Sequence, residues 1–214
     1  MTEPLWWALA AGGSAALAIW GHPPGRRVLH YVFKPLTMVL IIGLLWRQTP
    51  AGAPLLPWLT AALGLSLVGD VLLMLPARAF LGGLLAFLGA LGLYAIAFAR
   101  ELAWTPRMWL APLPAIVLAQ WVLRALWPHL RRLRVPVVIY VTAMVVMSTC
   151  ALARLAVPSL PLASAAWGAA GALLFMLGDT LLALRRFAHR RVPYALELGA
   201  YFAAQWALAA TAWA

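Results

Sequence analysis

The sequence predicts an all-α protein, a polytopic transmembrane helix bundle of about eight spans. Three observations support this fold class. Hydrophobic residues make up 65% of the 214 residues and charged residues only 10%, whereas about a quarter of the residues in an ordinary soluble domain are charged. The mean hydropathy is +0.93. The apolar residues also gather into long runs, and a helix needs roughly 20 of them to cross a bilayer.

Eight apolar runs follow one another along the chain, and Arg, Pro or Gly bounds each of them. The first run is only about 24 Å long as a helix, so a tilted entry from one surface, and hence seven spans, is the alternative. The connections are too short for an extramembrane domain, so any chemistry must lie in the bundle or at its mouths. We interpret residues 1–214 as a single transmembrane domain with spans at residues 5–20, 28–46, 56–75, 79–98, 108–127, 135–153, 160–184 and 194–213.

The basic residues are distributed unevenly between the two sides. Eleven Arg residues fall in or beside the connections that follow the odd-numbered runs, and four fall on the opposite side. Lys and Arg are retained in cytoplasmic loops, so we expect both termini outside the cytoplasm. Richness in Ala, Leu and Arg is typical of a GC-rich bacterial genome, which favours the bacterial cytoplasmic (inner) membrane. The net charge of +11 does not indicate nucleic acid binding, because the Arg residues separate apolar runs.

Two acidic residues interrupt the apolar runs, Asp70 in the third and Asp179 in the seventh. An ionised Asp within a span costs at least about 2.5 kcal/mol, so it normally faces the bundle interior or a wet cavity. The segments 66–75 and 175–184 are identical at five of ten positions, including the Gly-Asp pair. This similarity suggests a 4+4 internal repeat, with chance in a Leu-rich chain as the alternative.

Because the third and seventh runs cross in the same direction, both aspartates are expected toward the cytoplasmic ends of their helices. Two carboxylates that converge there could supply an acid and a base together. Hydration at the interface or capping of a neighbouring helix is the alternative. Further polar residues are expected at the same level, and on the last helix a polar stripe recurs at every fourth residue. These residues are Lys34, Tyr140 and Glu197, with Tyr201 and Gln205 continuing the stripe.

Lys34 could neutralise a carboxylate or hold a phosphate, and snorkelling to the interface is the alternative. Hydrogen-bonded packing is the alternative role for the tyrosines. The four histidines lie at or near turns without paired ligand spacing, so we interpret them as interfacial and expect no metal site. The single cysteine, Cys150, excludes an intrachain disulfide.

Several short motifs along the chain together resemble the YhhN-like lysoplasmalogenase family, over nearly the whole length. The sequence departs from the family pattern at Leu91, where the family often has His, and at Gly178, where a Ser often precedes the second Asp. The motifs, in chain order, are Lys34-Pro35-Leu36 with Met38, Ser66 with Gly69-Asp70 and Leu73, Phe87 with Tyr94, Pro136 with Tyr140 and Met147, Phe175 with Asp179 and Leu182, and Tyr201 with Gln205.

The resemblance implies an eight-span membrane hydrolase that cleaves the vinyl ether bond of lysoplasmalogens. The products are a fatty aldehyde and a glycerophospho-ethanolamine or glycerophospho-choline, and the reaction needs no cofactor. The expected partners are a lysophospholipid substrate and membrane lipids, with the headgroup and the oligomeric state left open. Asp70 and Asp179 are the expected catalytic acid and base, in an order that the sequence leaves open. The expected substrate-binding residues are Lys34, Tyr94, Tyr140, Glu197, Tyr201 and Gln205.

Two other classes of function remain open at this point. A small proton-coupled membrane transporter could use the same acidic residues and Lys34 as a proton or cation relay. A purely structural membrane protein would leave the matched Gly-Asp pairs unexplained. Aldehyde release in detergent discriminates these classes, because a carrier would show only binding or gradient-dependent flux.

Overall fold

The computed structural model describes residues 3–102 and 105–214, and the regular structure within these ranges is entirely helical. The all-α fold class is therefore confirmed. Short 3-10 helices lie at several of the connections, and eight α-helices fall in the eight apolar runs of the sequence. These helices are α1 (Glu3–Trp20), α2 (Arg27–Gln48), α3 (Leu56–Met74), α4 (Phe80–Ala99), α5 (Leu113–Leu126), α6 (Arg134–Ala153), α7 (Leu162–Phe187) and α8 (Tyr194–Ala210).

Among the described residues, six helical stretches are long and apolar enough to cross a membrane: Arg27–Gln48, Leu56–Met74, Phe80–Ala99, Pro106–His129, Arg131–Ala156 and Leu162–Phe187. Two helices are shorter, since the apolar part of α1 covers Leu5–Trp20 and α8 has 17 residues. The stretch Pro106–His129 is divided into a 3-10 helix at Pro106–Leu110 and α5. Pro112 and Pro114 explain this division, because proline lacks a backbone N–H and is best tolerated in the first turn of a helix.

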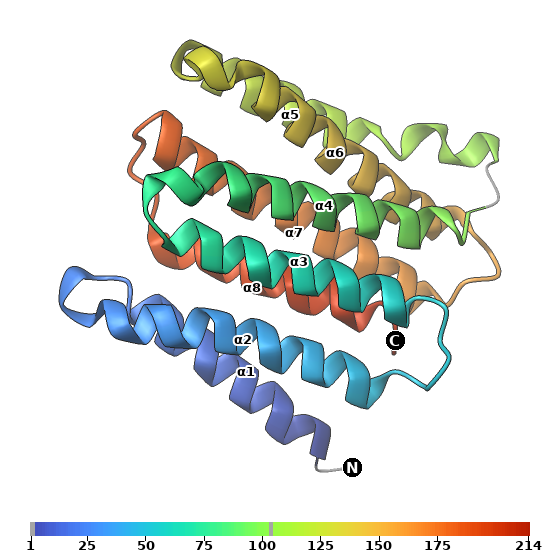
Figure 1. The fold of residues 1–214 in the computed structure, drawn as a ribbon. Helices are drawn as coiled ribbons and strands as arrows, with labels where there is room; N and C mark the ends of the chain where they lie inside the picture. The colour runs from blue at the N-terminus through green and yellow to red at the C-terminus, as the bar shows by residue number, and fades with distance from the viewer. Residues whose placement is uncertain (1–2, 103–104) are drawn as a thin grey trace.

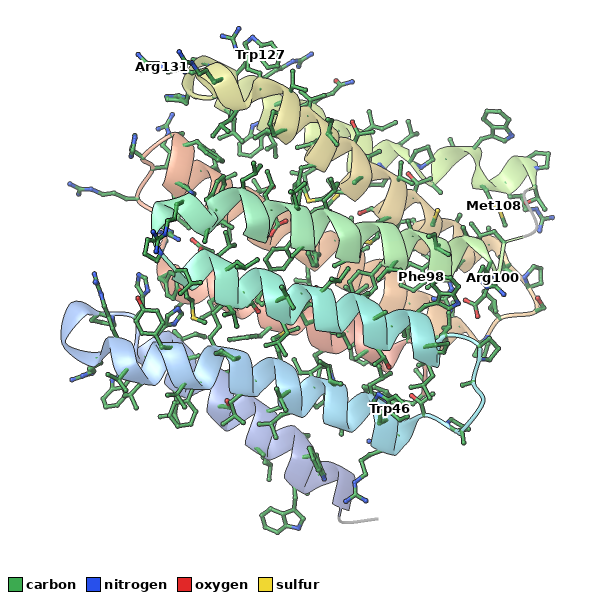
Figure 2. All side chains as sticks on the ribbon, viewed as in Figure 1. Trp46, Phe98, Arg100, Met108, Trp127 and Arg131 are labelled. Carbon is green, nitrogen blue, oxygen red and sulfur yellow. The ribbon has the colours of Figure 1, made fainter. Side chains whose placement is uncertain are left out.

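Consecutive helices run in opposite directions, so both chain termini lie at one end of the bundle (Figure 1). The α1–α2, α3–α4, α5–α6 and α7–α8 connections lie at the other end, which we call the arginine-rich end. Figure 2 shows Arg131 at this end and Arg100 at the opposite end. The last helix packs against α7, α2, α1 and α3, and this position brings residues from both halves of the chain together.

The two Gly-Asp pairs mark places where a helix is approached closely. A Cβ atom at Gly69 would lie 2.6 Å from the ring of Phe87, and one at Gly178 would lie 3.2 Å from the backbone nitrogen of Tyr201. Small residues allow helices in a membrane to approach each other in this way. The close approach lies one residue before each aspartate, which accounts physically for the paired Gly-Asp motif.

Candidate functional site

A cavity of about 430 Å³ lies at the arginine-rich end, between α2, α3, α4, α7 and α8. Both intramembrane aspartates line it, although they are more than a hundred residues apart in the sequence. Apolar side chains from α3, α4, α7 and α8 complete the wall. The polar side chains in the wall are His22, Arg27, His30, Tyr31, Lys34, Asp70, Asp179, Arg185, Arg186, Tyr194, Glu197 and Tyr201.

On one side of the cavity, Asp70 is held by groups from two other helices. Its carboxylate oxygen Oδ1 lies 2.9 Å from the Nζ atom of Lys34 on α2. Its other oxygen, Oδ2, accepts a hydrogen bond of 2.6 Å from the hydroxyl of Tyr201 on α8. Asp70 is only 1% exposed. A buried carboxylate with a cation and a hydroxyl on its two oxygens is the arrangement that compensates for removal from water.

On the other side, Asp179 has a different partner. The hydroxyl of Tyr140 on α6 donates a hydrogen bond of 2.5 Å to its Oδ2 atom. Asp179 is part-buried, and within residues 3–102 and 105–214 it makes no ion pair. The two aspartates therefore share a cavity but differ in charge environment, since only Asp70 has a counter-ion in direct contact.

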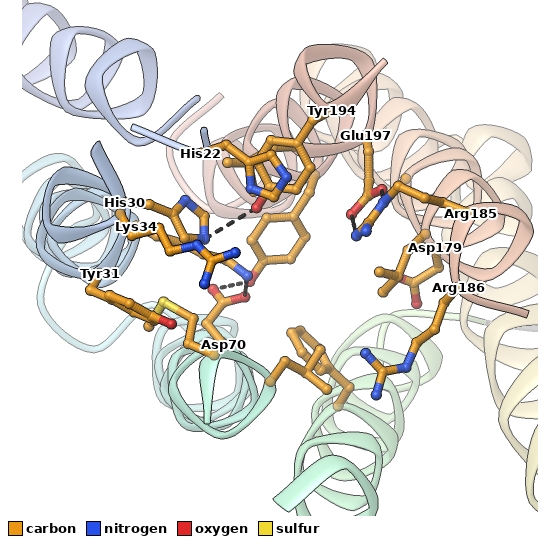
Figure 3. Close-up of a pocket in the computed structure, with 18 of the residues that line it drawn as sticks. His22, His30, Tyr31, Lys34, Asp70, Asp179, Arg185, Arg186, Tyr194 and Glu197 are labelled. Atoms are coloured by element: carbon orange, nitrogen blue, oxygen red, sulfur yellow. Dashed lines mark hydrogen bonds and ion pairs between the residues drawn. The ribbon is translucent and has the colours of Figure 1, made fainter. Parts of the chain in front are cut away.

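A second ion pair lies beside Asp179. The guanidinium of Arg185 donates to both carboxylate oxygens of Glu197, at 2.5 and 2.9 Å, and this pair joins the end of α7 to the start of α8. Arg186 lies over the Phe80 ring, with its guanidinium carbon 4.1 Å from the ring centroid. In Figure 3, Asp70 and Lys34 lie on one side of the cavity, and Asp179, Arg185 and Arg186 lie on the other.

Aromatic rings border the cavity near the α1–α2 connection. The rings of His22 and Tyr194 stack with centroids 3.3 Å apart, and the Tyr194 hydroxyl lies 3.1 Å from Nε2 of His30. Nδ1 of His30 lies 3.0 Å from the carbonyl oxygen of Ala18. Because a carbonyl only accepts, Nδ1 of neutral His30 carries the proton and Nε2 accepts from Tyr194. Burial lowers the pKa of His22, and the positive charge of nearby Arg185 acts in the same direction.

The sequence-predicted site residues fall into three groups. Asp70, Asp179, Lys34, Glu197 and Tyr201 line the cavity. Tyr140 lines a neighbouring apolar pocket, which it shares with Asp179. Tyr94 and Gln205 do not reach the cavity, and the Tyr94 hydroxyl donates a 2.8 Å hydrogen bond to Oε1 of Gln205 inside the bundle. The polar stripe on α8 therefore enters the cavity only with its first two members, because Gln205 lies one turn deeper than Tyr201.

Several residues of the cavity wall were missed by the sequence reasoning. His30 was interpreted only as an interfacial residue, whereas the structure places it in the cavity wall, 9% exposed and inside α2. A helical spacing could have found it, since His30 lies four residues before Lys34 and thus on the same face. By the same argument, Arg186 lies on the face of α7 that carries Asp179, because it follows Asp179 by seven residues. Tyr194 lies seven residues before Tyr201, on the stripe already recognised on α8.

Together, the apolar helices, their alternating direction and the cavity lined by polar side chains define a multi-pass α-helical membrane protein with two intramembrane carboxylates in one cavity. The chain belongs to the YhhN family, whose pattern matches residues 29–212.

Individual relatives agree with this assignment. The chain is 32% identical to the "Uncharacterized membrane protein YhhN" of Escherichia coli over 143 residues, which are 67% of this chain and 68% of that protein. It is 31% identical to a protein named "Lysoplasmalogenase" from Mycobacterium bovis over 198 residues, covering 85% of this chain and 71% of that protein. No solved structure matches the chain.

Proposed function

We propose that this protein hydrolyses the vinyl ether bond of lysoplasmalogens, releasing a fatty aldehyde and a glycerophospho-ethanolamine or glycerophospho-choline. The observation that carries the proposal is the pair of carboxylates that line one cavity with unlike partners, Asp70 with Lys34 and Asp179 with Tyr140. The relative named lysoplasmalogenase supports the same reaction. Hydrolysis of an enol ether needs a proton donor and a base, and two carboxylates in unlike environments are the usual way to supply both.

In this mechanism, Asp179 is the acid. Its contact is a neutral hydroxyl rather than a cation, so its other oxygen can carry a proton into the cavity. Asp179 transfers this proton to the vinyl carbon beta to the ether oxygen, which converts the substrate into an oxocarbenium ion. The contact between Asp70 and the Nζ atom of Lys34 at 2.9 Å stabilises Asp70 as the carboxylate. Asp70 is therefore the base.

The second half of the reaction returns both groups to their starting states. Water attacks the carbon bonded to the ether oxygen, and Asp70 accepts the proton that the water loses. The resulting hemiacetal then breaks its bond to the glycerol oxygen. Asp179 takes back a proton from the hemiacetal hydroxyl as the aldehyde forms, while Asp70 gives its proton to the departing glycerol oxygen. One water is consumed, and no group on the protein is left altered.

The headgroup phosphate binds at the arginine-rich end. Lys34 already pairs with Asp70, and Arg185 already pairs with Glu197, so we assign the phosphate to Arg27 and Arg186, which also line the cavity. A guanidinium can hold two phosphate oxygens at once. Because basic residues are retained in the cytoplasm, we expect the cavity at the cytoplasmic face of a bacterial inner membrane, with both termini on the far side.

The proposal is tested by measuring aldehyde release from a defined lysoplasmalogen by purified, folded protein in detergent. Asp70→Asn and Asp179→Asn should each lower release by about a hundredfold or more. The matched control is Thr142→Val, which removes a hydroxyl that bonds only within α6, to the carbonyl of Val138, and which should keep full activity. Full activity in either Asn variant would contradict the proposal. Detergent removes any gradient, so turnover there also excludes the proton-coupled carrier.

A further inference from the structure

Gln205 lies in the interior of the bundle, one helical turn deeper than Tyr201 on α8. Its exposed fraction is 0%. Its Oε1 atom accepts the 2.8 Å hydrogen bond from the hydroxyl of Tyr94 on α4, whereas its Nε2 atom has no hydrogen-bond partner among the described residues. A buried amide nitrogen that donates to nothing loses its hydrogen bonds to water without replacement, so a nearby acceptor is expected.

The Tyr201 hydroxyl is the acceptor that the geometry offers to this nitrogen. Residues four apart share one face of a helix, and the Gln205 side chain lies close to the Tyr201 hydroxyl. The bond from Tyr94 also fixes how the amide is turned, because Oε1 faces Tyr94 and Nε2 is then turned away from it. The Tyr201 hydroxyl gives its own hydrogen to Asp70, so its oxygen can still accept a hydrogen bond.

The Tyr201 hydroxyl has a single hydrogen and two acceptors within reach. Oδ2 of Asp70 lies 2.6 Å away, and Sδ of Met38 lies 3.6 Å away. Rotation of the hydroxyl toward the sulfur would remove its contact with the Asp70 carboxylate and leave the contact with Lys34. A donor behind the hydroxyl oxygen favours the orientation in which the hydrogen points to Asp70, because successive hydrogen bonds in a chain polarise and strengthen one another.

We propose that Gln205 is a positioning residue for Asp70: its Nε2 atom donates to the Tyr201 hydroxyl oxygen, and Tyr201 thereby keeps its hydrogen on the carboxylate. Tyr94 has the supporting role of holding the amide in the donating orientation. The kinetic consequence rests on the proposed function, in which Asp70 is the base. Gln205 acts on the reaction only through Tyr201.

The hydrogen bond on Asp70 can be followed without any turnover. Infrared spectra of the purified full chain, with the spectrum of Asp70→Asn subtracted, isolate the carboxylate stretching band of Asp70. Tyr201→Phe gives the position of this band without the hydroxyl. The test variant is Gln205→Met, which keeps the length of the side chain but removes the amide. Thr60→Val is the matched control, because the Thr60 hydroxyl donates within α3 to the carbonyl of Leu56.

A second variant separates positioning from stability. Gln205→Met leaves the Tyr94 hydroxyl buried without its acceptor, which destabilises the bundle. The double variant Tyr94→Phe/Gln205→Met removes both polar partners, and replacing a buried polar pair by apolar side chains of similar shape is nearly neutral. The double variant should therefore regain the wild-type unfolding midpoint in detergent.

In both Gln205 variants the Asp70 band should move from the wild-type position toward that of Tyr201→Phe, and in Thr60→Val it should stay at the wild-type position. The kcat for lysoplasmalogen hydrolysis should fall about fivefold in the double variant, which is the effect of one hydrogen bond, while KM stays unchanged. A wild-type band in the stable double variant would overturn the proposal, even if its turnover is low.

The infrared result is independent of the proposed reaction. A shifted band in protein that releases no aldehyde would retain the positioning role and overturn the lysoplasmalogenase proposal. Aldehyde release together with a wild-type band in the double variant would do the reverse.

Discussion

Two clusters of buried charge lie at opposite ends of the bundle, and one of them lines the 430 Å³ cavity. At the end that carries the chain termini, Arg154 is 1% exposed and donates to Oε2 of Glu101 at 2.8 Å and to Oγ of Ser164 at 2.9 Å. Ser164 in turn donates to the carbonyl of Thr211. Figure 2 labels Phe98 at this end, and its ring lies 5.1 Å from the guanidinium carbon of Arg154.

The comparison separates structural from functional buried charge. The Arg154 cluster joins the ends of α4, α6, α7 and α8 through donors and acceptors that satisfy one another. The Lys34 and Asp70 pair is equally buried, but it forms part of the wall of the 430 Å³ cavity. Both clusters carry the cost of desolvation. We infer that charge inside the membrane identifies a functional site only where a substrate can reach it.

The largest effect is expected at the cavity end of the bundle, and it tests the distinction between the two clusters. Asp179→Asn removes the proposed proton donor, so aldehyde release should fall by roughly a thousandfold, within the range expected for general acid catalysis. The midpoint of thermal unfolding should stay near the wild-type value, because asparagine can still accept from Tyr140. If the variant loses stability as well as activity, Asp179 would be a structural residue like those around Arg154.

The opposite pattern is expected at the Arg154 end. Arg154→Met leaves Glu101 and Ser164 without their shared donor, and breaking a buried pair of this kind costs about 3 kcal/mol. The unfolding midpoint measured in detergent should fall, while aldehyde release per folded molecule should stay within about twofold of wild type. A selective loss of turnover without a loss of stability would break the distinction between the two clusters.

Lys34→Met tests the charge state assigned to Asp70. Without the ammonium at 2.9 Å, Asp70 is expected to favour its neutral form, which cannot act as the base. Turnover should fall by about a hundredfold at neutral pH. Lys34→Arg retains a cation and should recover part of this loss. If Lys34→Met is as active as the wild type, Lys34 belongs with the snorkelling residues instead.

A smaller effect is expected from Tyr140→Phe. The substitution removes the hydrogen bond from Tyr140 to Asp179 and leaves the ring in the wall of the apolar pocket. The loss of one hydrogen bond to a charged or polar partner is worth about 1.5 kcal/mol, which corresponds to about a tenfold decrease in kcat. The KM for the lysoplasmalogen should be unaffected. An increase in KM without a decrease in kcat would assign Tyr140 to substrate binding alone.

The sequence predicted the helices and the main charged residues because each signal is local. Apolar runs locate the helices, and Asp70, Asp179 and Lys34 stand out as charges within them. The partners could not be predicted in the same way, since Tyr201 lies 131 residues from Asp70 along the chain. Arg185 looked like any basic residue at a span end, and only the packing of α7 against α8 pairs it with Glu197.

Tertiary packing also decides which polar residues reach the cavity. The stripe on α8 is periodic through Gln205, yet Gln205 bonds to Tyr94 inside the bundle. In the sequence, Arg154 served only in the count of basic residues on each side of the membrane. It is nevertheless one of the most buried side chains in the part of the chain that the structure describes. Burial of a long side chain depends on how four helix ends meet, which no local pattern reports.

The most direct test of carboxylate catalysis in the cavity follows the proton that Asp179 delivers. Purified wild-type protein would hydrolyse a defined lysoplasmalogen in D₂O, and the aldehyde would be trapped at once and examined by mass spectrometry. The mechanism predicts one deuterium on the carbon next to the aldehyde carbonyl and a slower turnover than in H₂O. Aldehyde without that deuterium, or no aldehyde at all from active, folded protein, would contradict proton transfer to carbon by this site.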